Sequence, residues 1–237
     1  MGSSANRVLE RLSVLVVDDH DINREFLHAA LSGTVGEVAT AKDGRAAVAL
    51  CQSRRFDVVL MDLHMPHMDG LAASQSIRES DGPSRNARIL ILTADARPED
   101  REHLLAHGVD GYLSKPTGIA QLIRAVLEQV TPGLEARTLP RAGSEETRLI
   151  APEQALDSAN GDPAMVARMS RLFARELGEK LPQLDRLIGR GQFTQAAELL
   201  HQWRGACGFA GAARLHQACG VLRRRLQEPA GLSVGAA

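Results

Sequence analysis

The chain has 237 residues, of which 44% are hydrophobic and 24% are charged, and its net charge is −1. This composition is typical of folded globular domains and excludes a disordered chain, a collagen-like repeat and a coiled-coil rod. The neutral charge balance and the 3% of aromatic residues are unlike a nucleic-acid-binding protein, so we expect no nucleic acid partner. No apolar run approaches the roughly 20 residues of a membrane span. We therefore expect a segment without membrane contact of its own, and its three cysteines, which form no CxxC pair, suit a cytoplasmic location.

The two halves of the chain carry opposite net charge. Residues 1–149 hold 21 acidic and 17 basic residues, a net charge of −4, whereas residues 150–237 hold 11 basic and 8 acidic residues, a net charge of +3. Opposite charges favour encounter of the two halves with each other or with each other's relatives. Residues 131–149 combine prolines, glycines and polar residues without apolar periodicity, which predicts a linker between domains at 12–130 and 150–237.

The first domain has the pattern of βα units, because short runs rich in Val, Ile and Leu alternate with longer amphipathic stretches. Strands are predicted at about 13–17, 36–40, 57–61, 88–92 and 110–113, and helices at about 21–32, 43–53, 69–79, 97–107 and 117–130. The runs 14–17 and 58–61 are wholly apolar, as expected for central strands covered on both faces. The second strand is weaker and is expected near an edge. The pattern predicts an α/β doubly wound, five-stranded parallel sheet.

The second domain contains helical patterns only, which predicts a separate all-α bundle. Helices are expected at about 152–158, at 163–189 with an interruption at Pro182, at 192–208 and at 211–227.

Residues of complementary chemistry close the predicted strands. Asp18 and Asp19 follow the first strand, Asp62 the third, Thr93 the fourth and Lys115 the fifth. The carboxyl ends of parallel strands meet at one edge of a sheet, so these side chains are expected to converge. Three carboxylates in one place repel one another and need a cation, and an all-oxygen site fits Mg²⁺. A hydroxyl and an ammonium facing that cation suit the oxygens of a phosphoryl group.

The same residues, in the segments VVLMDLHMPHMDG, LTADA and SKP, resemble those of a response-regulator receiver domain with a flavodoxin-like fold. The resemblance extends from residue 14 to about residue 130. It implies that Asp62 is the phosphorylated carboxylate and that Asp18 and Asp19 hold Mg²⁺ with it. The backbone carbonyl of His64 would be the remaining protein ligand.

The resemblance also assigns residues that respond to the phosphoryl group. It implies that Thr93 and Lys115 bind phosphoryl oxygens, and that Tyr112 changes rotamer as Thr93 moves. It further implies a cis peptide bond before Pro116. The side chain of His64, which lies in a loop, is expected to face solvent rather than to bind a transition metal.

A second set of residues lies in the stretch LLHQWRGACGFAGAARLHQACGVL. His201, Arg204 and Gly205 are spaced i, i+3 and i+4 and therefore share one helix face. A glycine inside a helix costs about 1 kcal/mol relative to alanine, so Gly205 is expected to leave room for another protein's active site. Two interpretations of His201 stay open: an exposed histidine whose phosphoryl charge Arg204 offsets, or a packed or capping histidine. Trp203 and Phe209 are expected to fill the core.

Residues from about 150 to 228 resemble a histidine-containing phosphotransfer (Hpt) domain, through FARELGEKLPQLDRLI and the motif His-x-x-Arg-Gly. The resemblance implies that His201 carries a phosphoryl group and that Arg204 and Gly205 serve docking. That family adds a further helix after the position of Leu226, whereas this sequence continues only to GLSVGAA. We therefore expect a bundle that lacks its last helix, with a groove that the first helix and a partner cover, or a bundle of lower stability.

These resemblances together indicate a two-component phosphorelay module. Asp62 would receive phosphate from a histidine kinase, and His201 would relay it to a downstream receiver domain or response regulator. The opening Asp-Asp-x-x-x-Asn-Arg resembles hybrid sensor histidine kinases, so the chain is interpreted as the C-terminal part of one, with its parent anchored in the inner membrane. No ATP-binding kinase domain is present in the sequence, and we expect Mg²⁺-dependent phosphoryl transfer without use of ATP. A dimer is one open alternative for the assembly.

The competing interpretation is a non-relaying receiver regulator whose helical domain binds a partner protein. Phosphoryl transfer from Asp62 to His201, or from His201 to a separate receiver, discriminates the two. A transcription factor is disfavoured because no basic recognition helix follows the linker.

Overall fold

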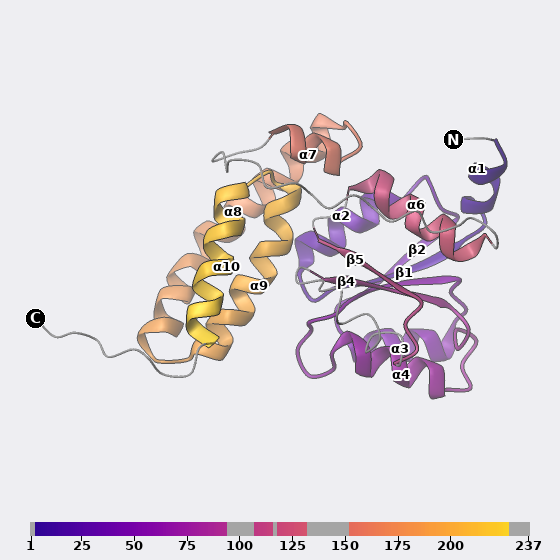
Figure 1. Ribbon diagram of the computed structural model, residues 1–237, viewed down its shortest axis with the longest axis horizontal. Helices are drawn as coiled ribbons and strands as arrows, with labels where there is room; N and C mark the ends of the chain where they lie inside the picture. The colour runs from indigo at the N-terminus through magenta and orange to yellow at the C-terminus, as the bar shows by residue number, and fades with distance from the viewer. Residues whose placement is uncertain (1–2, 94–106, 116–117, 132–151, 228–237) are drawn as a thin grey trace, which may run out of the picture.

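The structure, a computed structural model, describes residues 3–93, 107–115, 118–131 and 152–227. An α/β domain and a helical bundle lie side by side in it (Figure 1). The five strands pair in parallel in the order β2-β1-β3-β4-β5, which confirms the predicted doubly wound sheet and the edge position of the second strand. The strands are β1 (Ser13–Val17), β2 (Glu37–Ala41), β3 (Val58–Asp62), β4 (Arg88–Thr93) and β5 (Gly111–Ser114).

Helices cover both faces of the sheet (Figure 1). They are α2 (Asp21–Leu31), α3 (Gly44–Ser53), α4 (Gly70–Glu79) and α6 (Ile119–Val130). Helix α1 (Ser3–Leu9) was not predicted, and its Leu9 is buried against the same core as α2. The helix predicted at 97–107 falls almost wholly outside the described residues.

The alternation of side chains along β1 explains why its buried residues 14–17 are all apolar. Val14 and Val16 belong to the apolar cluster that includes α2 and α6, whereas Leu15 and Val17 belong to the cluster that includes α3 and α4. Because side chains of a strand point alternately to its two faces, a strand covered on both faces needs an apolar residue at every position.

The bundle consists of α7 (Pro152–Ser158), α8 (Pro163–Gly189), α9 (Phe193–Phe209) and α10 (Ala213–Gln227), and confirms an all-α second part. Pro182 does not interrupt α8, contrary to expectation. A proline cannot donate to the carbonyl four residues earlier, which here belongs to Gly178. Both residues are exposed, so that carbonyl is free to accept from solvent, and the helix continues through Pro182.

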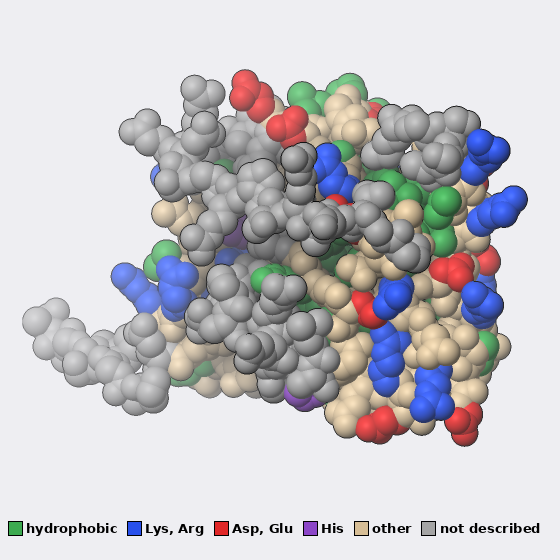
Figure 2. Space-filling view, turned by 45° about the vertical axis from the view of Figure 1, so that its right-hand side comes forward, with side chains coloured by type: hydrophobic (Ala, Val, Ile, Leu, Met, Phe, Trp, Pro, Cys, Tyr) green, Lys and Arg blue, Asp and Glu red, His purple; other side chains and the backbone are tan. Residues whose placement is uncertain are grey.

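The two parts of the molecule share one apolar cluster. Helix α2 packs against α8 and α9, and the cluster extends from β1 and α2 to bundle residues such as Phe173 and Trp203. The face in Figure 2 has basic and acidic side chains interspersed over the α/β domain. Within the described ranges, every helix is too short or too polar to cross a bilayer.

Candidate functional site

Three aspartates converge at the carboxyl end of the sheet. Asp18 follows β1 directly, Asp19 comes next, and Asp62 is the last residue of β3. One carboxylate oxygen from each lies within 4.8 Å of the others. Asp18 and Asp62 are buried and Asp19 is half-buried. The convergence predicted from the strand ends is therefore present in the fold.

Lys115 is the ammonium that faces this cluster. Its Nζ lies 2.7 Å from Asp18 Oδ2 and 3.0 Å from Asp62 Oδ1. Burial opposes the charge on Lys115, but Asp18 and Asp62 outweigh it and raise the lysine pKa. Burial raises the pKa of Asp62, and repulsion from Asp18 adds to the rise against the attraction of Lys115. Three carboxylates and one ammonium leave negative charge that a bound cation would neutralise.

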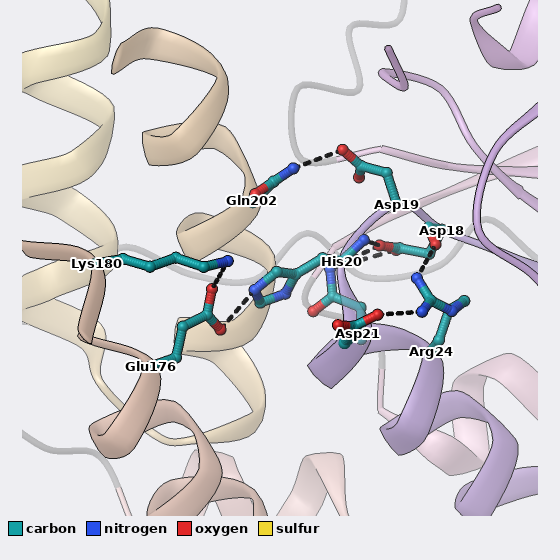
Figure 3. Close-up of polar contacts among 9 residues, drawn as sticks. Asp18, Asp19, His20, Asp21, Arg24, Glu176, Lys180 and Gln202 are labelled. Atoms are coloured by element: carbon teal, nitrogen blue, oxygen red, sulfur yellow. Dashed lines mark hydrogen bonds and ion pairs between the residues drawn. The ribbon is translucent and has the colours of Figure 1, made fainter. Parts of the chain in front are cut away.

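The backbone and α2 hold Asp18 in place. Its Oδ1 accepts a hydrogen bond from the His20 backbone N–H at 2.9 Å, and Asn23 Nδ2 lies 3.2 Å from the same oxygen. Arg24 Nη1 donates to the Asp18 carbonyl at 2.8 Å, and Arg24 Nη2 pairs with Asp21 (Figure 3). Asp18 therefore has little freedom to move away from Asp62.

Thr93 and Tyr112 lie on the neighbouring strands β4 and β5. Thr93 ends β4 and is buried, and the Lys115 backbone N–H donates to its carbonyl at 2.7 Å. Tyr112 pairs with Ile91 and is partly buried against the α3 and α4 side of the sheet. Pro116 lies outside the described residues, so its expected cis bond does too.

His201 on α9 packs against the α/β domain. Its exposed fraction is 9%, and its ring centroid lies 4.9 Å from that of His64 in an edge-on arrangement. His201 is therefore packed in this structure, and its packing partner is the other domain. His64 keeps an exposed side chain as expected, in the loop two residues after Asp62.

The neighbour of His201 contacts the carboxylate cluster directly. Gln202 Nε2 donates to Asp19 Oδ2 at 2.7 Å (Figure 3). Burial raises the pKa of Asp19, and this hydrogen bond acts in the opposite direction. A cleft of about 520 Å³ opens beside them and is lined by residues of both domains, among them Asp19, His64, His201, Gln202 and Arg223.

Gly205 and Arg204 lie on different sides of α9. A Cβ atom on Gly205 would come within 2.7 Å of Asn23 Nδ2, so the missing side chain makes room for the Asn23 side chain of the same chain. The Arg204 Nε lies 3.4 Å from where a Cβ of Gly220 would be, so this side chain runs along α10. Phe209, expected in the bundle core, is buried against Phe26 of α2.

Sequence reasoning did not single out His20, Glu176 or Gln202. Each makes its contact across the two domains, between residues more than a hundred positions apart. The only signal in the sequence was the opposite net charge of the two halves.

Comparisons with known proteins agree with this division. The family model of the response regulator receiver domain matches residues 14–127, and that of the Hpt domain matches residues 168–234. The sensor histidine kinase AruS of Pseudomonas aeruginosa is 31% identical over 234 residues, which are 93% of this chain and 22% of that protein. The sensor protein GacS of Pseudomonas syringae pv. syringae is 33% identical over 216 residues, which are 87% of this chain and 24% of that protein.

The chain thus spans less than a quarter of the length of these relatives. Among solved structures, the receiver domain of a sensor histidine kinase from Pseudomonas aeruginosa PAO1, with a magnesium ion coordinated in its active site cleft, is 34% identical. That similarity covers 50% of this chain and 97% of the other, with a TM-score of 0.46.

Proposed function

Because this chain belongs to the response regulator receiver family and carries an Hpt domain after the receiver, we propose that Asp62 accepts a phosphoryl group and that His201 relays it. The two domains make the chain a module of two-component phosphorelay signalling. The observation that supports the proposed roles most directly is the shared cleft, which Asp19 of the carboxylate cluster and His201 both line.

The proposed chemistry needs few groups. A carboxylate oxygen of Asp62 attacks the phosphorus of a donor phosphohistidine, and the P–N bond of the donor breaks as the new P–O bond forms. In the second step an imidazole nitrogen of His201 attacks that phosphorus, and the Asp62 carboxylate leaves. Such transfer depends on position and charge more than on acid–base groups, because the phosphoryl group is loosely bonded in the transition state.

The residues around Asp62 suit these steps. The ammonium of Lys115, already 3.0 Å from Asp62, binds a phosphoryl oxygen, and the hydroxyl of Thr93 binds another. Asp18, Asp19, Asp62 and the carbonyl of His64 would hold Mg²⁺, and the buried carboxylate set fits that ion. When bound, Mg²⁺ supplies positive charge to the phosphoryl oxygens.

The similarity to AruS and GacS supports a wider proposal about origin and partners. We infer that the chain is part of a hybrid sensor histidine kinase, that a histidine kinase is the phosphoryl donor, and that a further receiver domain or response regulator is the acceptor from His201.

The test uses the full chain with radiolabelled acetyl phosphate and Mg²⁺. Wild type is compared with Asp62→Asn and His201→Gln, and with His28→Gln as a matched control at an exposed histidine. We expect label on the wild type and on His28→Gln that includes an acid-labile fraction. Asp62→Asn loses all label, and His201→Gln loses the acid-labile fraction alone.

One outcome favours the second candidate function, a regulator whose helical domain only binds. Its specific support is the burial of His201 against the receiver domain. If Asp62 is labelled while His201 neither gains label nor passes it to an added receiver domain, the relay proposal is wrong and the binding function replaces it.

A further inference from the structure

Helix α2 of the receiver domain contacts the Hpt domain through one face, and the centre of that face is apolar. The rings of Phe26 and Phe209 stack with centroids 3.8 Å apart and planes 17° apart. Both side chains are almost fully buried, and the surrounding apolar cluster runs through both domains without a break. Aromatic stacking adds to the free energy gained from burial alone. This face is therefore a packed interface.

A buried polar pair lies beside this apolar centre. His20 Nε2 is 2.8 Å from Glu176 Oε2, and the two side chains are only 3% and 11% exposed. Lys180 donates to the other Glu176 oxygen at 2.6 Å (Figure 3). Burial opposes ionisation of Glu176, but His20 and Lys180 outweigh it and lower its pKa to about 2. Glu176 is therefore a carboxylate held by a partner on each domain.

The third element of this face is a close fit between Asn23 and Gly205. Any side chain at position 205 would begin 2.7 Å from Asn23 Nδ2. Asn23 has little room to yield, because the same nitrogen lies 3.2 Å and 3.3 Å from the two oxygens of Asp18. A helix without a glycine at this point would displace a residue that supports the carboxylate cluster.

We propose that His20, Asn23 and Phe26 form a docking surface that is specific for the Hpt domain of this same chain. The His20–Glu176 pair is its main selective contact. A foreign helix without the carboxylate leaves His20 buried and unpaired, which discriminates against it. The proposal rests on the proposed function in one respect, because the docked Hpt domain is the one that carries His201.

Two further observations favour an occupant from the same chain. Glu25 of α2 pairs with Arg168 of α8 at the rim, in agreement with the opposite net charges of the two halves. One chain also supplies both surfaces, and a short tether holds them at an effective concentration of about millimolar. A docked Hpt domain therefore competes strongly with any domain that arrives from solution.

The test measures amide hydrogen exchange in the full chain by mass spectrometry, without any phosphoryl donor. Wild type is compared with Glu176→Ala, Glu176→Gln and the matched control Glu179→Ala, whose glutamate pairs only with Arg175 among the described contacts. In Glu176→Ala we expect exchange of α2 and α9 to rise by roughly tenfold, since a buried charged hydrogen bond across an interface is lost. Exchange in α3 and α4 stays at the wild-type value, which reports that the domain is folded.

The other variants make the result decisive. Glu179→Ala should match the wild type, and Glu176→Gln should lie between wild type and Glu176→Ala because a glutamine oxygen still accepts from His20. Equal exchange in all variants overturns the proposal. Protection of α2 that disappears on dilution means that a second copy is the occupant, which overturns the same-chain assignment.

The labelling experiment with acetyl phosphate separates this inference from the function. If protection from exchange depends on Glu176 but the chain never forms phosphohistidine, the docking surface is supported and the relay proposal is wrong. If His201 forms phosphohistidine but protection from exchange does not depend on Glu176, the relay is supported and the docking proposal is wrong.

Discussion

Phe26 of the receiver domain and Phe209 of the Hpt domain stack face to face, with ring centroids 3.8 Å apart. Both residues end up buried, at 1% and 2% exposure. Each would expose a large apolar ring if its domain stood alone. The pair therefore couples the stability of the two domains.

Replacing both rings tests this coupling. Phe26→Ala and Phe209→Ala should each lower the free energy of unfolding by about 3–5 kcal/mol, as for other buried phenylalanines. The double variant should lose about 0.5–1.5 kcal/mol less than the sum, because the stacking interaction can be lost only once. Urea unfolding of the four full-length chains measures the cycle. Strict additivity would mean that the rings do not stabilise each other.

A methyl group at Gly205 should separate the domains, whereas the same change at Gly178 should stabilise the chain. The Cβ of Gly205→Ala meets Asn23 at 2.7 Å, but that of Gly178→Ala meets nothing within 4 Å on an exposed part of α8. Gly178→Ala should gain roughly 0.5–1 kcal/mol from helix propensity. In Gly205→Ala the contact with Asn23 should cancel the gain in helix propensity, and amide exchange in α2 should become faster. Equal stability of the two variants would contradict the close fit at Asn23.

Much of the receiver fold follows from local patterns in the sequence. The runs 14–17 and 58–61 are apolar at every position, as expected for strands buried on both faces, and they lie in β1 and β3. Pro182 shows the limit of such rules. The free-energy cost of this proline depends on whether the carbonyl of Gly178 is exposed to solvent. That exposure is set by the tertiary structure and not by the local sequence.

The carboxylate cluster was predictable for the same reason, since parallel strands end at one edge and Asp18 and Asp62 close two of them. The surroundings of His201 were not predictable. Helical spacing shows which residues share a face of α9, but not what packs against that face. Phe209 illustrates the point: its burial was expected, but its partner Phe26 belongs to a domain about which the local pattern carries no information.

Acid should weaken the contact between the domains through Glu176. Its pKa is lowered from 4.5 to about 2 in the folded chain, so its contribution to stability is complete above pH 4.5 and is lost as the pH falls toward 2. The difference in unfolding free energy between wild type and Glu176→Gln should shrink by about 1–2 kcal/mol over that range, allowing for solvent screening. Glu179→Gln, at an exposed pair, should show no such trend. Parallel pH profiles for wild type and Glu176→Gln would refute the effect.

Removal of Lys115 should make the stability of the chain depend strongly on Mg²⁺. Lys115 is the ammonium within 3.0 Å of both Asp18 and Asp62, and all three residues are buried. Lys115→Ala leaves the carboxylates to repel one another, which should cost about 3–5 kcal/mol of unfolding free energy in metal-free buffer. A cation that binds the folded chain recovers stability in proportion to the logarithm of its concentration, so Mg²⁺ should restore part of this loss. Urea midpoints with and without Mg²⁺ measure both effects, and Lys42→Ala, at an exposed lysine, is the matched control. A Lys115→Ala chain as stable as Lys42→Ala without metal would mean that the carboxylates are already protonated and that repulsion among them does not shape the site.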